Sequence, residues 1–155
     1  STMPASLYTI GYEGTSLQAF VHTLKAHGVE TVADVRELPL SRKRGFSKTA
    51  LSEELASQGL WYVHLRALGC PREIRRDYRA DGDWARYTRR YLAYLETQNE
   101  AVQSLARLAQ QGNCALVCFE ANAARCHRSY VAEATAKHLG PSAKAVHLVP
   151  DSTRP

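Results

Sequence analysis

The residues best suited to chemistry lie in the last third of the chain. Glu120 follows an apolar run, and a few positions later stand Arg125, Cys126, His127 and Arg128. Basic neighbours and a helix N-terminus both favour the thiolate form of a cysteine and the binding of anions. Arginines three positions apart on a helix can share one phosphate, so we predict that Arg125 and Arg128 bind an anion. Glu120 is then the candidate general base or metal ligand, His127 a proton donor and Cys126 a nucleophile.

The same residues also admit structural interpretations. A single cysteine is more often a small packing residue than a nucleophile, and a neighbouring histidine can serve as a cap or a core residue. Cys118 and Arg125 are spaced as C-x6-R, which differs from the C-x5-R loop of cysteine phosphatases. We expect Cys118 to be buried and Cys126 to be the better thiol, which keeps a cysteine-dependent enzyme among the alternatives.

A carboxylate and an arginine form a second group of candidates. Alternation along a strand places Asp34 and Arg36 on the same side. Burying a carboxylate in a strand costs free energy unless the group is ion-paired or hydrogen-bonded, so a buried carboxylate without such partners suggests a catalytic role. Either the two residues form a structural salt bridge, or they face a phosphate-bearing ligand together, with Asp34 as an alternative catalytic base. Ser41 and Arg42 belong to a basic loop that either contacts the substrate or is simply solvated.

Two further loops contribute substrate-binding candidates. Tyr12, Glu13 and Gly14 stand just before a predicted helix, whose free N–H groups would face an anion. Their spacing matches neither the dinucleotide fingerprint nor the P-loop, and an ordinary strand-to-helix turn explains it equally well. His64 is a further substrate-binding candidate, because it lies at the carboxyl end of the third predicted strand.

The sequence leaves metals and cofactors unknown. A metal site stays open for four residues near the ends of predicted strands: Asp34, Glu120, His127 and His147. Their spacing demands no metal, and the four cysteines include no CxxC pair. No metal ligand is therefore assigned.

Arginines and aromatic residues alternate through residues 66–94. Such a mixture can hold a sugar-phosphate backbone while bases stack on the rings, at about 1–3 kcal/mol per stacked base. Trp84, Tyr87 and Tyr91 keep a helical spacing, however, and are expected in the core. The arginines of residues 72–79 belong either to a nucleic-acid surface or to a mobile lid.

Alternating elements must position these side chains. Short apolar runs predict five strands, at residues 7–10, 31–35, 61–65, 114–119 and 145–149. Helical periods predict helices between Ser16 and Gly28, between Ser47 and Gly59, from Asp83 onward with a division near residues 97–99, and over residues 123–139. This alternation predicts a single-domain, three-layer α/β/α fold with a mostly parallel, Rossmann-like sheet of about five strands. The ligand crevice of such a sheet lies at the carboxyl ends of its strands, where the candidate residues gather.

The composition favours one cytoplasmic domain with an anionic partner. The chain has 155 residues, 45% of them hydrophobic, which suffices for one core over residues 1–155. Residues 1–5 are expected to form a tail, with Ser1 and Thr2 placed ahead of a native Met3. No apolar run approaches the about 20 residues needed to span a bilayer, so no membrane partner is expected. The net charge of +5, mostly arginine, favours an anionic ligand such as a nucleotide or nucleic acid.

Short motifs occur along the chain in a definite order. They are Thr-Ile-Gly-Tyr at 9–12, Asp-Val-Arg at 34–36, Pro-Leu-Ser-Arg at 39–42, Tyr-Val-His-Leu at 62–65, Leu-Gly at 68–69, Cys-Phe-Glu at 118–120 and Cys-His-Arg at 126–128. In this order they resemble the bacterial and archaeal family called domain of unknown function 488 (DUF488). The resemblance implies a small cytosolic α/β protein and supplies no established reaction. The pattern differs at Tyr12 and Glu13, where the family suggests a histidine and a small hydroxyl residue.

Three functions follow from these residues. The leading hypothesis is an enzyme acting on a phosphate-containing substrate, with the anion held by Arg36, Arg125 and Arg128. The first alternative is a non-catalytic nucleic-acid-binding module, which would show steep salt dependence and no chemistry. The second alternative is the cysteine-dependent enzyme, and the oligomeric state is not predicted.

Overall fold

Five parallel strands form the centre of the structure, a computed structural model that describes residues 7–150. The strands are β1 (Leu7–Gly11), β2 (Thr31–Asp34), β3 (Trp61–His64), β4 (Cys114–Cys118) and β5 (Ala145–Leu148). They lie in the order β3-β2-β4-β1-β5, and each pairing is parallel. The central strand β4 is buried at every residue, as expected for an apolar strand covered on both faces.

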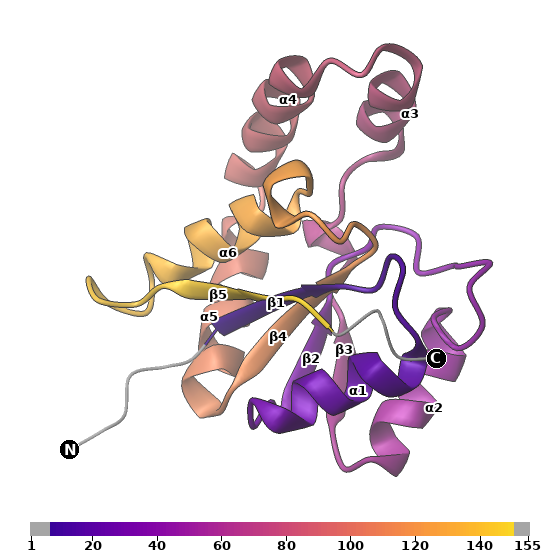
Figure 1. Ribbon diagram of the computed structural model, residues 1–155. Coiled ribbons are helices and arrows are strands. Elements are labelled where there is room, and N and C mark those ends of the chain that lie inside the picture. Colours follow the sequence, from indigo (N-terminus) through magenta and orange to yellow (C-terminus); the bar gives the residue numbers. More distant parts are fainter. Residues whose placement is uncertain (1–6, 151–155) are drawn as a thin grey trace.

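Helices cover both faces of this sheet (Figure 1). The helices α1 (Leu17–Ala26) and α2 (Lys48–Ser57) pack on one face, and α5 (Asn99–Gln111) and α6 (Arg128–Ala136) pack on the other. Two further helices, α3 (Arg72–Asp81) and α4 (Trp84–Glu96), form a hairpin that projects from the rest of the molecule. The predicted three-layer α/β/α fold with a parallel sheet is confirmed.

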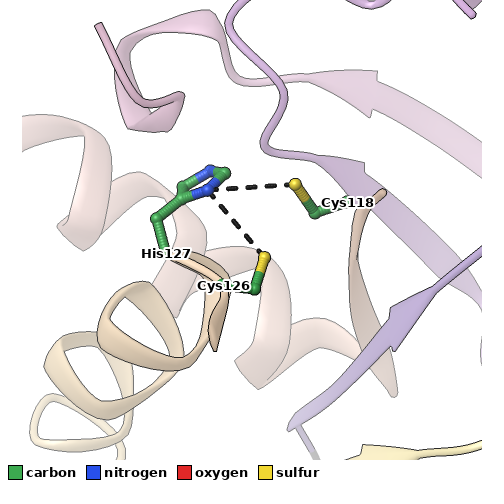
Figure 2. Close-up of side chains that lie close together, drawn as sticks. All are labelled: Cys118, Cys126 and His127. Atoms are coloured by element: carbon green, nitrogen blue, oxygen red, sulfur yellow. Dashed lines mark hydrogen bonds between the residues drawn. The ribbon is translucent and has the colours of Figure 1, made fainter. Parts of the chain in front are cut away.

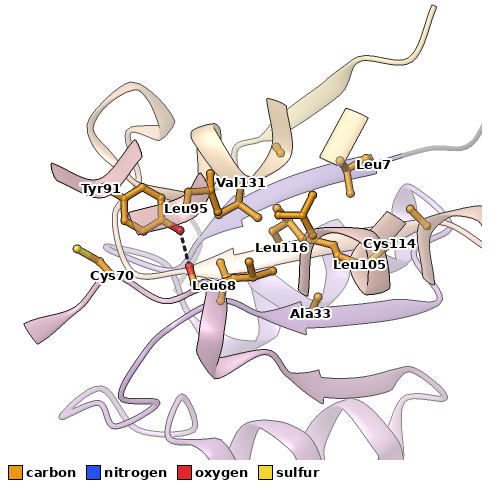
Figure 3. Close-up of a cluster of buried hydrophobic side chains, with 14 of the residues drawn as sticks. Leu7, Ala33, Leu68, Cys70, Tyr91, Leu95, Leu105, Cys114, Leu116 and Val131 are labelled. Atoms are coloured by element: carbon orange, nitrogen blue, oxygen red, sulfur yellow. Dashed lines mark hydrogen bonds between the residues drawn. The ribbon is translucent and has the colours of Figure 1, made fainter. Parts of the chain in front are cut away.

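Alternation along the strands produces one apolar core on each side of the sheet. On β4, Leu116 faces α5 and α6, whereas Val117 faces α1 and α2. The first core also receives Leu105, Val131 and Tyr91, whose hydroxyl donates to the carbonyl oxygen of Leu68 at 2.6 Å (Figure 3). The buried hydroxyl is thereby satisfied, so its ring can pack among aliphatic side chains.

The order of the strands explains where a ligand crevice can form. In the dinucleotide-binding order 3-2-1-4-5-6 the first two strands are neighbours, whereas here β4 separates β1 from β2. The chain leaves β2 toward α2 on one face and leaves β4 toward α6 on the other. Because these neighbouring connections diverge, a crevice opens between the carboxyl ends of β2 and β4.

Most predicted elements are confirmed with small shifts of their ends. Ser16 caps α1, since its Oγ accepts from the backbone N–H of Ala19 at 3.0 Å, and Ser47 precedes α2 as predicted. The predicted tail over residues 1–5 lies outside the described residues. The prediction of one domain over residues 1–155 also extends beyond them and stays a prediction. None of the helices within residues 7–150 has the length and apolarity needed to cross a membrane.

The predicted helix over residues 123–139 is wrong at its start. Ala123–Arg125 form a 3-10 turn, and α6 begins only at Arg128. Asn122 caps the short turn, because its Oδ1 accepts from the N–H of Ala124 at 3.0 Å. Cys126 and His127 therefore precede the helix instead of occupying its first turns.

Candidate active site

A pocket of about 970 Å³ occupies the crevice between the carboxyl ends of β2 and β4. Its walls come from the loops after β1, β2 and β4 and from the α3–α4 hairpin. The predicted site residues that line it are Tyr12, Arg36, Ser41, Arg42, Glu120, Arg125 and His127. The predicted residues that do not line it are Glu13, Gly14, Asp34, His64, Cys126 and Arg128.

Two thiols and an imidazole converge at the wall of this pocket (Figure 2). Nδ1 of His127 lies 3.8 Å from Sγ of Cys118 and 3.9 Å from Sγ of Cys126. Sγ of Cys118 also lies 3.6 Å from Oε1 of Glu120. We call Cys118, Cys126 and His127 the thiol–imidazole cluster. Together with Glu120 it brings a possible acid, base, nucleophile and metal ligand within one small volume.

Backbone geometry assembles the thiol–imidazole cluster from two segments that are only eight or nine residues apart in the chain. Cys118 ends β4, and the 3-10 turn leads the chain back so that Cys126 and His127 lie beside it. Nε2–H of His127 donates to the carbonyl oxygen of Val35 at 2.6 Å, at the end of β2. This bond assigns the ring proton to Nε2 in the neutral tautomer and directs Nδ1 toward the two sulfur atoms.

The ionisation of these groups is interdependent. Burial opposes ionisation of Cys126, but its hydrogen bonds with Cys118 and His127 outweigh burial, so the pKa of this thiol lies well below its ordinary value. Burial alone would lower the pKa of His127, yet the neighbouring Cys126 raises it. The hydrogen bond with Cys126 and burial raise the pKa of Cys118. Burial and the charge of Cys126 raise the pKa of Glu120 to about 7.

Arg128 is a buried structural residue rather than a pocket residue. Its side chain is 0% exposed, Nε donates to Oγ1 of Thr9 at 3.1 Å, and its two terminal nitrogens donate to the carbonyl oxygens of Glu120 and Ala121. The predicted sharing of one phosphate with the exposed Arg125 is therefore not supported. Its contribution to the site is to hold the Glu120 loop and to lower the pKa of Cys126 through its charge.

The Glu120 loop is also fixed by a close backbone approach at Gly11. A Cβ atom at this position would lie 1.8 Å from the carbonyl oxygen of Glu120. Only a residue without a side chain fits there. The end of β1 and the peptide of Glu120 are thus in direct main-chain contact.

Asp34 and Arg36 form a salt bridge with each other. This is the structural alternative that the sequence offered beside joint binding of a phosphate-bearing ligand. Nε and Nη2 of Arg36 donate to Oδ1 and Oδ2 of Asp34 at 2.9 and 2.7 Å, and Nη1 donates to the Tyr12 hydroxyl and the Phe46 carbonyl. The Tyr62 hydroxyl donates to the same carboxylate. Burial alone would lower the pKa of Arg36, but Asp34 raises it, so the guanidinium stays charged. This network supports the wall of the pocket from behind.

The first loop is a turn in which three backbone N–H groups already have partners. The N–H groups of Tyr12, Glu13 and Thr15 donate to backbone carbonyls at 3.2, 2.8 and 3.1 Å. Gly14 has a φ of 74°, which explains the glycine, and the Glu13 carboxylate accepts from Ala121 N–H at 3.0 Å. Of the three predicted residues Tyr12, Glu13 and Gly14, Tyr12 lines the pocket, and their role in binding an anion stays a prediction.

His64 has a comparable supporting role outside the pocket. Its Nε2 bonds with the carbonyl oxygen of Arg36 at 2.8 Å. The contact fixes the backbone just after β2, where the pocket loop begins.

Helix α3, which we did not predict, supplies much of the positive charge of the pocket. Arg72, Arg75 and Arg79 all line the pocket, with spacings that bring them to one side of the helix. Within residues 7–150, no carboxylate lies within 4.0 Å of the guanidinium groups of Arg42, Arg72, Arg79 or Arg125. Arg75 pairs with Glu37 at 3.0 Å, but its buried Nε has no hydrogen-bond partner among the described residues.

Sequence reasoning missed Cys118 as a site residue and left the role of α3 open. The C-x6-R spacing drew attention to Cys118, but nothing in the spacing showed that the chain returns to it. The prediction that Trp84, Tyr87 and Tyr91 belong to the core is met for the two tyrosines, which are 7% and 0% exposed. Trp84 is half-buried, and with Tyr87 it forms an aromatic wall of the pocket.

The four residues for which a metal site stayed open do not converge. Asp34 is paired with Arg36, and Nδ1 of His147 bonds with Oγ1 of Thr9 at 2.6 Å. Among residues 7–150, the potential ligand atoms found within 4.8 Å of one another in a group of three are those of Cys118, Cys126 and His127.

The fold and the pocket define a class: a three-layer α/β protein with ionisable residues at the carboxyl edge of a parallel sheet. Comparison with known protein families identifies the family to which the chain belongs. It belongs to the family described as Domain of unknown function DUF488, whose sequence model matches residues 16–135. A search of curated proteins found no match, and a search of solved structures found none either.

Proposed function

We propose that this protein is a cytoplasmic enzyme acting on a phosphate-containing substrate, either a nucleotide or a nucleic-acid strand. The observation that carries the proposal is that arginines without carboxylate partners share one pocket with Glu120 and the thiol–imidazole cluster. A pocket that combines convergent polar groups with perturbed ionisable residues is the default location for catalysis. The four cysteines, all free and buried, fit a reducing compartment.

The arginines would hold the anionic part of the substrate. Arg72 and Arg79 approach the pocket from α3, and Arg125 approaches from the loop after β4. The planar guanidinium group binds phosphate oxygens in pairs. Arg36 is engaged by Asp34 and would act only by supporting these residues.

Glu120 is the residue best placed to move a proton. Its carboxyl group lines the pocket, and burial brings its pKa to about 7, which lets it accept and return a proton at neutral pH. The aromatic wall of Trp84 and Tyr87 would face the apolar part of a nucleotide. The aromatic wall favours an organic phosphate over inorganic phosphate.

Two alternatives predict different behaviour. A non-catalytic nucleic-acid-binding module would use the same arginines, lose affinity steeply with salt and show no turnover. A cysteine-dependent enzyme is favoured by the low pKa of Cys126, but this thiol is 1% exposed and does not line the pocket. Burial makes Cys126 better suited to a supporting role than to attack on a substrate.

The test is a thermal-shift panel of phosphate, nucleotides and short RNA or DNA strands, followed by a turnover assay on each binder. A ligand at one hundred times its Kd adds about 2.7 kcal/mol. For a chain of this size that corresponds to a rise in Tm of roughly 5–10 °C. The double variant Arg72→Ala/Arg79→Ala should lose the shift. Arg107→Ala, on the exposed face of α5, should keep it.

Replacing Glu120 by Gln separates catalysis from binding. We expect Glu120→Gln to keep the thermal shift and to lose at least about a hundredfold in turnover, the usual contribution of a general acid or base. Unchanged turnover would remove Glu120 from the mechanism. Binding without turnover in the wild type would instead support the nucleic-acid-binding module.

A further inference from the structure

We propose that the thiol–imidazole cluster is a binding site for one soft divalent cation of the zinc class. The site comprises Cys118, Cys126 and His127, whose ligand atoms all lie within 4.8 Å of one another. Thiolate and imidazole are the ligands that select zinc over the hard cations magnesium and calcium.

The nitrogen–sulfur separations already lie near those of a tetrahedral site. With Zn–S of about 2.3 Å and Zn–N of about 2.0–2.1 Å, two such ligands at the tetrahedral angle are about 3.6 Å apart. The Nδ1–Sγ separations here are 3.8 Å to Cys118 and 3.9 Å to Cys126. For these two nitrogen–sulfur pairs a bound cation requires shifts of only a few tenths of an ångström, and the two sulfur atoms lie within 4.8 Å of each other.

The orientation of His127 is the one expected of a metal ligand. Nε2–H donates to the carbonyl oxygen of Val35, so in the neutral ring Nδ1 carries a lone pair. That lone pair faces the space between the two sulfur atoms (Figure 2). Bonding of the second ring nitrogen to a backbone carbonyl is the usual outer support of a ligating histidine.

Burial favours ligation over nucleophilic attack for these thiols. Cys118 and Cys126 are 5% and 1% exposed, which hinders a substrate from reaching them but suits a bound ion. The two sulfurs come from the end of β4 and from the end of the 3-10 turn, both of which are held by backbone hydrogen bonds. The site is thus preformed by the fold.

Three protein ligands leave the fourth position open, as in catalytic zinc sites. Cys118 and His127 line the pocket, and Oε1 of Glu120 lies 3.6 Å from Sγ of Cys118. A water molecule bound there would transfer one proton to the Glu120 carboxylate and remain as hydroxide, the nucleophile of a hydrolytic reaction. This last step rests on the proposed function, whereas cation binding does not.

The experiment measures cation binding by the full chain directly. Protein stripped with a chelator is titrated with Zn²⁺ against a chromophoric competitor, and with Co²⁺ by absorption spectroscopy. We expect one equivalent of Zn²⁺ and a cobalt spectrum with tetrahedral bands and thiolate-to-cobalt charge transfer. Cys118→Ser and Cys126→Ser should each weaken Zn²⁺ binding by at least about a hundredfold, the upper end of what loss of an outer-shell partner causes.

Cys70→Ser is the matched control. This thiol also lines the pocket and is 1% exposed, but it lies outside the thiol–imidazole cluster. The control variant should bind Zn²⁺ as the wild type does. Equal Zn²⁺ binding by the wild type and by Cys118→Ser/Cys126→Ser would overturn the proposal. So would a wild-type cobalt complex without charge-transfer absorption, a result that requires no variant to fold.

The two proposals fail in different ways. Tight Zn²⁺ binding without a thermal shift or turnover would preserve the cation site and remove the proposed function. Turnover by metal-free protein, with no Zn²⁺ bound at one equivalent, would preserve the function and remove the cation site. Glu120→Gln should keep its Zn²⁺ while losing turnover.

Discussion

Asp34 and Arg36 depend on each other because both side chains are almost completely buried. Their side chains are 0% and 6% exposed, and the carboxylate accepts two hydrogen bonds from the guanidinium group. A buried charge that loses its partner is far more costly than an exposed one. The pair therefore supports the pocket wall only while it is complete.

We expect Asp34→Asn to lower the free energy of unfolding by about 3–5 kcal/mol, because it leaves Arg36 buried and uncompensated. Glu37→Gln is the control, since Glu37 pairs with Arg66 and Arg75, whose side chains are 73% and 30% exposed and therefore remain in contact with solvent. Exposed pairs contribute about 0–1 kcal/mol. Urea denaturation measures both. Equal losses in the two variants would contradict the structural role of the buried pair.

At the residue scale, the spacing of residues along the sequence predicted a contact within one strand, but it did not predict the contact between Cys118 and His127. Alternation placed Asp34 and Arg36 on one side, and they do pair. The same reasoning could not place Cys118 beside His127, because that contact depends on a 3-10 turn where a continuous helix was expected. The direction of a short turn is set by its cap and by tertiary contacts, which spacing does not reveal.

At the element scale, the α3–α4 hairpin is held by an ionic network as well as by aromatic packing. Asp77 of α3 accepts from Arg86 at 3.3 Å and from Arg90 at 2.6 Å, both on α4. Tyr78 packs edge-on against Trp84. Helix α3 has one buried apolar residue, Ile74, and this lack of an apolar period is why the helix was not predicted.

The hydrogen bond from Arg90 lowers the pKa of Asp77 below its ordinary value. Because the folded pKa is lowered, the stabilisation is present above the unfolded pKa of about 4 and is lost as the pH falls below it. We expect hydrogen-exchange protection factors of α3 to fall over this range relative to those of α5. In Asp77→Asn this pH-dependent part should vanish, and its persistence would assign the effect to other groups.

At the scale of the whole molecule, the sheet joins two cores that must unfold together if the chain is one domain. Leu105 belongs to the core beneath α5 and α6, and Leu51 to the core beneath α1 and α2. Both are 0% exposed. Strand β4 contributes side chains to each core, so either helix layer that separates leaves apolar side chains of the central strand exposed to water.

We therefore expect Leu105→Ala and Leu51→Ala each to cost about 2–5 kcal/mol and to shift the same calorimetric transition. Trp61→Ala, at an edge strand where the ring is 76% exposed, should change stability by about 0.5 kcal/mol or less. Two separate transitions, with each leucine variant moving only one, would show that the chain is not a single cooperative domain.

Gly11 fixes one separation within the candidate active site through direct main-chain contact. The distance between the end of β1 and the peptide of Glu120 is set by main-chain atoms on both sides. Substitutions that change the volume of either core can move helices relative to the sheet, yet the contact at Gly11 itself contains no side chain whose size could change it. Related chains could therefore diverge widely in their packing while Glu120 keeps its place, provided that position 11 admits no residue larger than glycine.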